Sequence, residues 1–381
     1  MLNKFLFIDS PTSNKRSYWI DALRGFFAIW VMFSHVIPWS VINLSTDSSS
    51  IPYRIIVFLT RGFQTVGETH PAVLCFIVLS GYCIHRNGLR DIGKQSVTKY
   101  AIRRLFRIYP VYIFAILIGV FSFIISTHNN AQLVQGLTAT KAIGILGLIV
   151  KSTGLSSFWP FAHSFSFQGN APLSTVAVEM YLYALYPIVL YFVYKHKKES
   201  IIFYGCIFSF LIGVILMCFL NSLYGWWNNG SIVGFFPYWW IGVFSLNKRF
   251  SEAIWRKKNL LVVFWVLLSI SIYLLSLRFT VIAEILAELR KVIFALIFGS
   301  SIWYFDTNVN VKNNILSWIG KSGYSIYAIH APIAVLMLSL NFSYIVIIPI
   351  VILIGLLMFF VIEKPANNIG RTIAEKASVI K

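Results

Sequence analysis

Residues 20–35 read IDALRGFFAIWVMFSH, an apolar run that contains three ionisable side chains, Asp21, Arg24 and His35. A charged group inside a lipid bilayer is costly and usually has a function there. At roughly 100° of turn per residue, a helix places all three side chains within an arc of about 60°. The segment therefore predicts a membrane-spanning helix with one polar face.

The composition extends this prediction to the whole chain. Of its 381 residues, 58% are hydrophobic, 17% are aromatic and only 12% are charged. Such a chain is solvated by lipid rather than folded as an ordinary soluble domain. We predict an all-α, polytopic bundle of about ten transmembrane helices over these apolar segments: Ala22–Pro38, Val66–Ile84, Tyr109–Ile125, Ser174–Tyr194, Ile201–Leu220, Ile232–Leu246, Leu260–Leu277, Lys291–Phe305, Ile315–Leu338 and Tyr344–Ile362.

The basic residues indicate the orientation of this bundle, because Lys and Arg favour cytoplasmic loops. Ten spans with both termini inside place 23 of the 32 Lys and Arg residues in cytoplasmic segments. The apolar run 142–150 is shorter than the roughly 20 residues that cross the hydrocarbon core, so we expect it to be re-entrant or interfacial. Residues 1–381 are expected to form a single membrane domain, with cytoplasmic tails at 1–18 and 363–381.

The net charge of +19 raises the question of nucleic-acid binding. The basic residues are dispersed between apolar segments, where they anchor cytoplasmic loops and meet anionic lipid headgroups. We therefore expect the basic residues to contact membrane lipids and not to bind nucleic acid. No bound metal is expected either, because the four cysteines lie in apolar segments without the spacing of metal ligands.

Arg24 and His35 suggest a chemistry for the first span. They are separated by roughly 16 Å along a helix, with Arg24 nearer the cytoplasm, which resembles the reach of a pantetheine arm between its phosphate and its thioester. Histidine can take and return a proton near neutral pH, as the activation of a sugar hydroxyl requires. The alternative for His35 is a core histidine that is hydrogen-bonded to a neighbouring span, but its alignment with Arg24 favours catalysis.

Three arginines stand before the third span, in the sequence RRLFRIYP: Arg103, Arg104 and Arg107. Guanidinium groups bind phosphate through paired hydrogen bonds, so this cluster is a candidate site for the diphosphate of a coenzyme A. Positive-inside anchoring explains the same cluster equally well.

Three further polar residues fall within apolar segments. Glu179 is a candidate to orient His35 or to grip an acceptor sugar, and a helix–helix hydrogen bond is the alternative. His330 and Glu363 are interpreted as structural polar contacts.

Several stretches of the chain resemble the membrane acyltransferase-3 family. The first span matches its opening signature, in which an Arg or Lys is followed by ten residues and a His. The other similar stretches extend almost to the end of the chain: FIVLSGYCI, RRLFRIYP, LSTVAVEMYLYALYP, WIGKSGYSIYAIHAP and VIEKPA. Together these motifs cover the chain from Asp21 to Pro365.

The resemblance implies a ten-span bundle of the bacterial inner membrane that takes an acyl group from cytoplasmic acyl-CoA and delivers it to a glycan hydroxyl on the far side. It implies that His35 is the catalytic base and Arg24 its essential companion. Arg104 and Arg107 match the paired arginines of the family, and Glu179 matches its acidic position. Acetyl-CoA is then the expected donor substrate, with no permanently bound cofactor.

The chain also departs from the family pattern. Many members have Trp-Ser-Leu followed by a doubled acid, whereas this chain has a single Glu179 followed by Met180. Many members carry an extracytoplasmic esterase-like domain that is not expected here, so the membrane domain must perform the transfer. The expected acceptor is an O-antigen, capsule or exopolysaccharide. Peptidoglycan, a small molecule, or a transporter of a lipid-linked or anionic solute are the alternatives.

Overall fold

The computed structural model describes residues 17–43, 55, 58–60, 69–88, 97–138, 143–196, 200–276, 279–309 and 312–377. These residues form helices, and no β-strand occurs among them. In chain order the helices are α1 (Tyr18–Asn43), α3 (Pro71–Gly88), α4 (Val97–Thr138), α5 (Ile145–Thr153), η1 (Leu155–Ser157), α6 (Pro160–Phe165), α7 (Leu173–His196), α8 (Ser200–Phe219), α9 (Asn221–Gly230), α10 (Ile232–Phe244), α11 (Lys248–Arg256), α12 (Lys258–Ser276), α13 (Thr280–Asn308), α14 (Ile315–Lys321), α15 (Gly323–Ser339), α16 (Tyr344–Met358), the π-helical turn η2 (Phe359–Glu363) and α17 (Lys364–Lys376).

In the described part of the chain, the ten apolar segments predicted to span a membrane fall largely on helices. Residues 66–68 of the segment Val66–Ile84 lie outside the described residues, and Thr69 and His70 precede α3. Six helical runs are long and apolar enough to cross a bilayer: α1, α4, α7, α8, α12 and the continuous run from α16 through α17. Helices α14 and α15 make a seventh candidate if they form one span, although they are bent by 74°. The all-helical class is thus confirmed, while the count of about ten spans and the cytoplasmic position of the termini stay predictions.

Helix α5 corresponds to the short apolar run at 142–150. Its nine residues extend about 14 Å, roughly half of the hydrocarbon thickness, so it cannot span a bilayer. Gly154 ends the helix in the left-handed conformation, with φ of 70°. The chain therefore turns away after α5 instead of continuing as a span.

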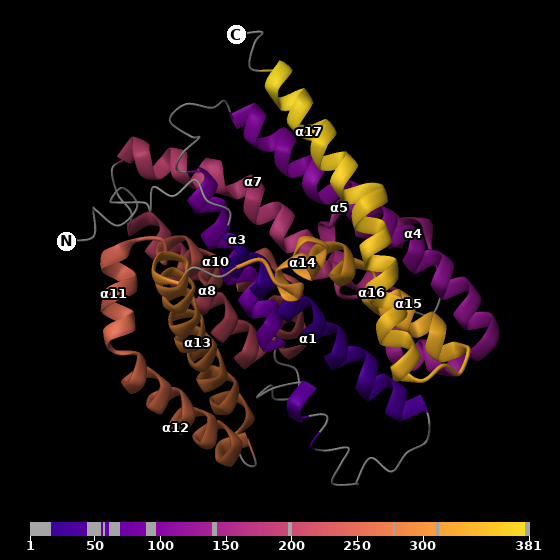
Figure 1. Ribbon diagram of the computed structural model, residues 1–381. Coiled ribbons are helices and arrows are strands. Elements are labelled where there is room, and N and C mark those ends of the chain that lie inside the picture. The colour runs from indigo at the N-terminus through magenta and orange to yellow at the C-terminus, as the bar shows by residue number, and fades with distance from the viewer. Residues whose placement is uncertain are drawn as a thin grey trace.

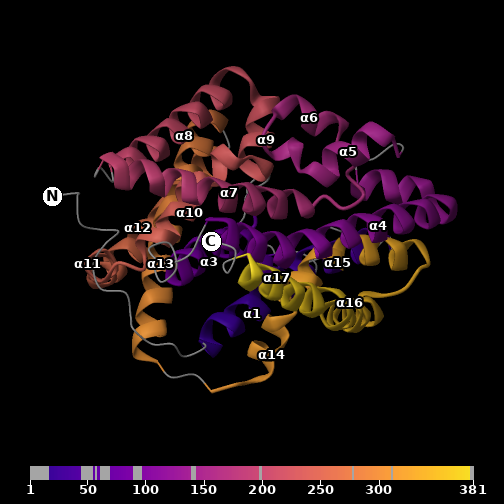
Figure 2. The same cartoon turned by 90° about the horizontal axis from the view of Figure 1, so that it is seen from above.

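The long helix α7 lies inside the assembly. Figure 2 shows α5, α6, α8 and α9 on one side of α7, and α1, α14, α15 and α17 on the other. Figure 1 shows α11, α12 and α13 grouped at one edge and the C-terminal helices α15, α16 and α17 at the opposite edge. Segments from both ends of the chain, α1 and α14–α17, therefore lie on the same side of α7.

Helices α1 and α14 cross at backbone contact. A Cβ on Gly25 of α1 would overlap the carbonyl oxygen of Leu316, and a Cβ on Gly320 of α14 would overlap that of Asp21. Small residues permit this close approach, which is a common way for helices to pack within a membrane. The contact fixes α14 against the first turns of α1, where Asp21 and Arg24 lie.

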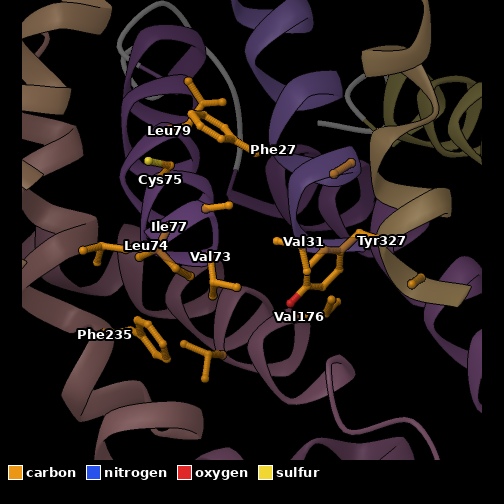
Figure 3. Close-up of a cluster of buried hydrophobic side chains, with 14 of the residues drawn as sticks. Phe27, Val31, Val73, Leu74, Cys75, Ile77, Leu79, Val176, Phe235 and Tyr327 are labelled. Atoms are coloured by element: carbon orange, nitrogen blue, oxygen red, sulfur yellow. The ribbon is translucent and has the colours of Figure 1, made fainter. Parts of the chain in front are cut away.

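The buried core lies where α1, α3, α7 and α15 meet. Figure 3 shows Phe27 and Val31 of α1, Val73 of α3, Val176 of α7 and Tyr327 of α15 in this region. Each of these side chains is at most 8% exposed. The core thus holds in place the helix segments that bear the ionisable residues of α1 and α7.

The crossing of α1 and α14 predicts a stability difference between two glycine variants. Gly320→Ala should lower the thermal midpoint of the detergent-solubilised protein, because overpacking costs about 1–3 kcal/mol. Gly225→Ala is the matched control in α9, where an added Cβ meets no atom within 4 Å. Equal midpoints for the two variants, measured by differential scanning fluorimetry, would contradict the close packing of these helices.

Candidate functional site

A cavity of about 610 Å³ opens between helices that are distant in the sequence. Its volume lies within the roughly 300–1,000 Å³ that is typical of small-molecule sites. It is lined by Asp21 and Arg24 of α1; Val73, Phe76, Ile77, Leu79 and Ser80 of α3; Arg107 and Ile108 of α4; Thr175, Val176, Glu179 and Tyr183 of α7; Trp318, Gly320, Lys321, Tyr324 and Tyr327 of α14 and α15; and Phe359, Phe360, Glu363, Lys364, Asn367, Asn368 and Arg371 of η2 and α17.

The cavity has an exposed end and a buried end. Arg371 and Lys364 of α17 are exposed, whereas Val73, Val176 and Tyr327 are buried. A ligand would therefore enter beside α17 and extend inward between α1, α3 and α7.

Glu179 lies in the wall of the cavity and is held by neighbouring hydroxyls. Ser80 Oγ donates a hydrogen bond to Glu179 Oε1 at 2.7 Å, and the hydroxyl of Tyr183 donates to the same oxygen. The indole nitrogen of Trp239 in turn donates to Ser80 Oγ at 3.3 Å. The carboxylate thus connects α7 to α3 and α10, as a helix–helix contact would, and it also faces the cavity.

Arg24 lines the same cavity from α1. Its Nη1 lies 3.4 Å from Asp21 Oδ1, three residues earlier on the same helix face. The crossing with α14 leaves 25% of the Arg24 side chain exposed. The guanidinium is therefore paired but still accessible from the cavity.

Glu363 lines the cavity from the π-helical turn η2. Ser325 Oγ of α15 donates a hydrogen bond to Glu363 Oε2 at 2.5 Å, and Glu363 is only 5% exposed. A π-helical turn widens the helix by one residue and is frequent at functional sites. Here it places a buried acid beside the α17 end of the cavity.

The three arginines of the cluster at 103–107 have different surroundings. Arg107 lines the cavity. The guanidinium of Arg104 instead lies over the rings of Tyr100 and Tyr183, 5.7 and 5.5 Å from their centroids. Arg103 is partly buried on α4 and is not part of the cavity wall. Arg104 therefore contacts the cavity only through Tyr183, which also holds Glu179.

His35 is paired with His330 of α15. His330 Nε2 lies 3.2 Å from His35 Nδ1, and the ring centroids are 5.1 Å apart. His330 Nδ1 lies 2.6 Å from the carbonyl oxygen of Tyr327, and His35 Nδ1 lies 3.0 Å from that of Val31. A carbonyl oxygen only accepts hydrogen bonds, so each Nδ1 carries a hydrogen when its ring is neutral. His330 Nε2 then accepts from His35 Nδ1, and Nε2 becomes the proton-accepting nitrogen of His35.

Tyr327 separates the cavity from this histidine pair. It forms part of the buried end of the cavity, and its ring centroid is 5.5 Å from that of His330. Its hydroxyl is 2.6 Å from Thr175 Oγ1 of α7. Neither histidine is in the cavity wall: His330 contacts Tyr327, and His35 lies beyond it, against His330.

From the sequence alone, His330 and Glu363 are interpreted as structural polar contacts. The structure places His330 against His35 and Glu363 in the cavity wall. The stretch GKSGYSIYAIHAP contains His330, but a lone histidine in an apolar helix gives no indication of its partner. The sequence did not identify the side chains of α17 that line the cavity, because a charged segment after the last predicted span is typical of a cytoplasmic tail.

Glu179→Ala should lower the thermal stability of the purified protein, because it removes the acceptor shared by the hydroxyls of Ser80 and Tyr183 and leaves the two hydroxyls only each other. An unsatisfied buried group costs about 1–3 kcal/mol. Ser80→Ala combined with Glu179→Ala completes a double-mutant cycle, in which the two changes should be non-additive. Strictly additive shifts in the thermal midpoint would show that the two side chains are not coupled.

Comparison with known proteins assigns the chain to a family. Residues 17–363 match the family model of the acyltransferase domain, a range that includes every residue of the histidine pair and all the cavity residues up to Glu363. Comparison with curated proteins and with solved structures gave no match. The family match covers nearly the whole chain and agrees with the six membrane-length helical runs found in the described residues. The chain therefore belongs to the acyltransferase-3 family of multi-pass membrane acyltransferases.

Proposed function

We propose that the protein transfers an acetyl group from cytoplasmic acetyl-CoA to a hydroxyl of a surface glycan, across the inner membrane of a bacterium. The observation that carries this proposal is the cavity that begins beside α17 and ends at Tyr327, one residue layer from the pair formed by His35 and His330. A donor in the cavity and an acceptor from the opposite end of α1 would meet near His35.

In this proposal, binding of the acetyl-CoA donor depends on the cations of the cavity. Arg24 and Arg107 line it and can pair with phosphate groups. Arg24 and His35 lie on the same continuous helix, so their eleven-residue separation corresponds to about 16 Å. A phosphate near Arg24 would allow an extended pantetheine arm to bring its thioester toward Tyr327 and the histidine pair.

The buried end favours a short acyl group. Phe76 and Tyr327 pack edge to face with centroids 5.6 Å apart, and both line the cavity. These rings close the buried end of the cavity on the side where the histidine pair lies. Acetyl is the group that fits this restriction best.

In the proposed reaction, His35 Nε2 takes the proton of the acceptor hydroxyl as its oxygen attacks the thioester carbonyl. The carbon–sulfur bond then breaks, and the sulfur leaves as the CoA thiol after receiving that proton from His35. The hydrogen on His35 Nδ1 is shared between the Val31 carbonyl oxygen and His330 Nε2. Both acceptors keep the lone pair on Nε2, and His330 orients the ring and stabilises the imidazolium that forms. His330 is thus a positioning residue for His35.

Glu179 and Arg24 act as an electrostatic pair in this proposal, because both face the same cavity. The carboxylate offsets the guanidinium charge when the site is empty and stabilises its position when phosphate binds. Arg104 supports this arrangement through the Tyr183 ring.

The proposed acceptor is a neutral sugar hydroxyl of an O-antigen, capsule or exopolysaccharide unit presented at the membrane. The outer segments at 221–231 and 339–343 contain no Lys or Arg, which gives little attraction for a strongly anionic acceptor. A lipid-linked oligosaccharide would be brought to the outer end of α1 by its own membrane anchor.

His35→Ala should abolish transfer, because no other group would take the proton of the hydroxyl. Cells that lack the gene and express the variant should have no base-labile acetate on surface polysaccharide, and their membranes should release no CoA from acetyl-CoA when supplied with that polysaccharide. His196→Ala, at the exposed end of α7, is the control and should behave as wild type. Transfer at a comparable rate by His35→Ala would exclude this mechanism, and loss of acetate from peptidoglycan alone would exclude this acceptor.

His330→Ala should lower kcat by about 10²–10³-fold, because His35 Nδ1 keeps only the Val31 carbonyl oxygen as an acceptor and loses the group that orients its ring and stabilises the imidazolium. The KM for acetyl-CoA should change little, and the pH profile of kcat should shift. His330→Gln should recover part of the rate, since its amide oxygen can accept from His35 Nδ1. A purely structural role for His330 predicts instead less protein in the membrane with an unchanged pH profile.

A further inference from the structure

Cations are concentrated at the exposed end of the cavity. Lys321 of α14, Lys364 and Arg371 of α17, and Arg107 of α4 all line it. Over the residues that the structure describes, no carboxylate oxygen lies within 4 Å of these four cationic groups. Among the described residues, these four cationic groups therefore have no ion-pair partner.

The acids of the cavity have other partners, including the buried Glu363 beside the α17 end. Asp21 is paired with Arg24, Glu179 accepts from Ser80, and Glu363 accepts from Ser325. None of these acids forms an ion pair with the four cationic groups. A negatively charged ligand would supply the missing ion-pair partners.

Helix α17 presents a regular polar stripe to the cavity. Lys364, Asn367, Asn368 and Arg371 are at positions i, i+3, i+4 and i+7, which share one face of a helix. The stripe extends about 10 Å along the helix axis. A neighbouring face packs on α4, where Gly370 approaches Phe106. The side chains of the stripe thus belong to the cavity and do not serve to attach the helix.

The chemistry of the stripe points to a phosphorylated nucleotide. Lys and Arg donate charge-assisted hydrogen bonds to phosphate oxygens, and carboxamides can both donate to and accept from ribose or a base. Two cations separated by two amides are suited to a ligand whose phosphates lie on either side of a polar, uncharged part. A lipid headgroup also has a phosphate, but its acyl chains hold it at the membrane surface. The stripe instead lines a cavity that continues inward to Arg24.

We propose that Lys321, Lys364, Asn367, Asn368 and Arg371 form an outer subsite that binds the phosphorylated nucleotide end of the acyl donor. This assignment rests on the proposed function, in which the inner part of the same cavity receives the thioester arm. The subsite selects the carrier: a thioester of a 3′-phosphorylated nucleotide binds, whereas a bare pantetheine thioester lacks the groups that the stripe recognises.

The test is to measure binding of CoA, 3′-dephospho-CoA and pantetheine to the full-length protein in nanodiscs of neutral lipid, by calorimetry. The wild type should bind CoA about tenfold more tightly than 3′-dephospho-CoA, and pantetheine more weakly still. The double variant Lys364→Gln/Arg371→Gln should lose at least tenfold in CoA affinity and should no longer distinguish CoA from 3′-dephospho-CoA. Lys376→Gln is the matched control, an exposed lysine at the end of the same helix and outside the cavity.

Each other outcome overturns the assignment in a distinguishable way. If the wild type binds CoA and the double variant binds it equally well with the same thermal midpoint, the outer subsite is wrong and the proposed function stands. If the variant loses affinity only in nanodiscs that contain phosphatidylglycerol, the stripe binds lipid phosphate. If the wild type binds none of the three compounds, both the subsite and the proposed donor are wrong.

Discussion

Charged and polar side chains inside a membrane domain are stable only where protein groups replace water around them. This constraint explains why the ionisable residues of the protein gather between helices. Asp21 and Arg24 pair along α1, and α14 approaches them at backbone distance through Gly320. The same crossing positions Lys321 at the cavity, so one close packing contact supports both the buried pair and the exposed cationic end.

A second polar cluster shows what a fully satisfied site in this fold looks like. Lys291 of α13 forms an ion pair with Glu288 and donates to Asn228 Oδ1 at 2.5 Å. The hydroxyls of Tyr224 and Tyr238 donate to the two oxygens of Glu288, at 3.0 and 2.7 Å. Here each charge meets a partner from within the protein, as a structural network requires. The cations beside α17 differ because the described part of the chain provides them with no carboxylate, and this difference is the physical basis for treating the cavity as a binding site.

The cavity and the histidine pair are separate but adjacent features. Tyr327 belongs to both: its ring closes the buried end of the cavity, and its carbonyl oxygen fixes the hydrogen on His330. In the proposed reaction this separation keeps the donor and the acceptor on different sides of one residue layer until transfer. It also limits the access of water to the thioester, since the layer is made of buried side chains. Family membership establishes an acyltransferase, and the histidine that we propose as its catalytic base lies inside the bundle against α15.

The sequence by itself determined the helical membrane class, the position of nearly every apolar helix and the shared face of Asp21, Arg24 and His35. These features are local, because apolar run length and the helical period follow from neighbouring residues alone. The same helical period could not identify what that face meets. The contact of His35 with His330 joins residues 295 positions apart, and it depends on how α1 and α15 pack. Only the tertiary structure distinguished Arg107 in the cavity from Arg104 on its tyrosine rings. Only the tertiary structure showed that the polar stripe of α17, which follows the π-helical turn at Phe359–Glu363, lines the cavity. Helix packing decides these points because a helix fixes the direction of its side chains relative to its own axis, whereas contacts between helices fix the axes relative to one another.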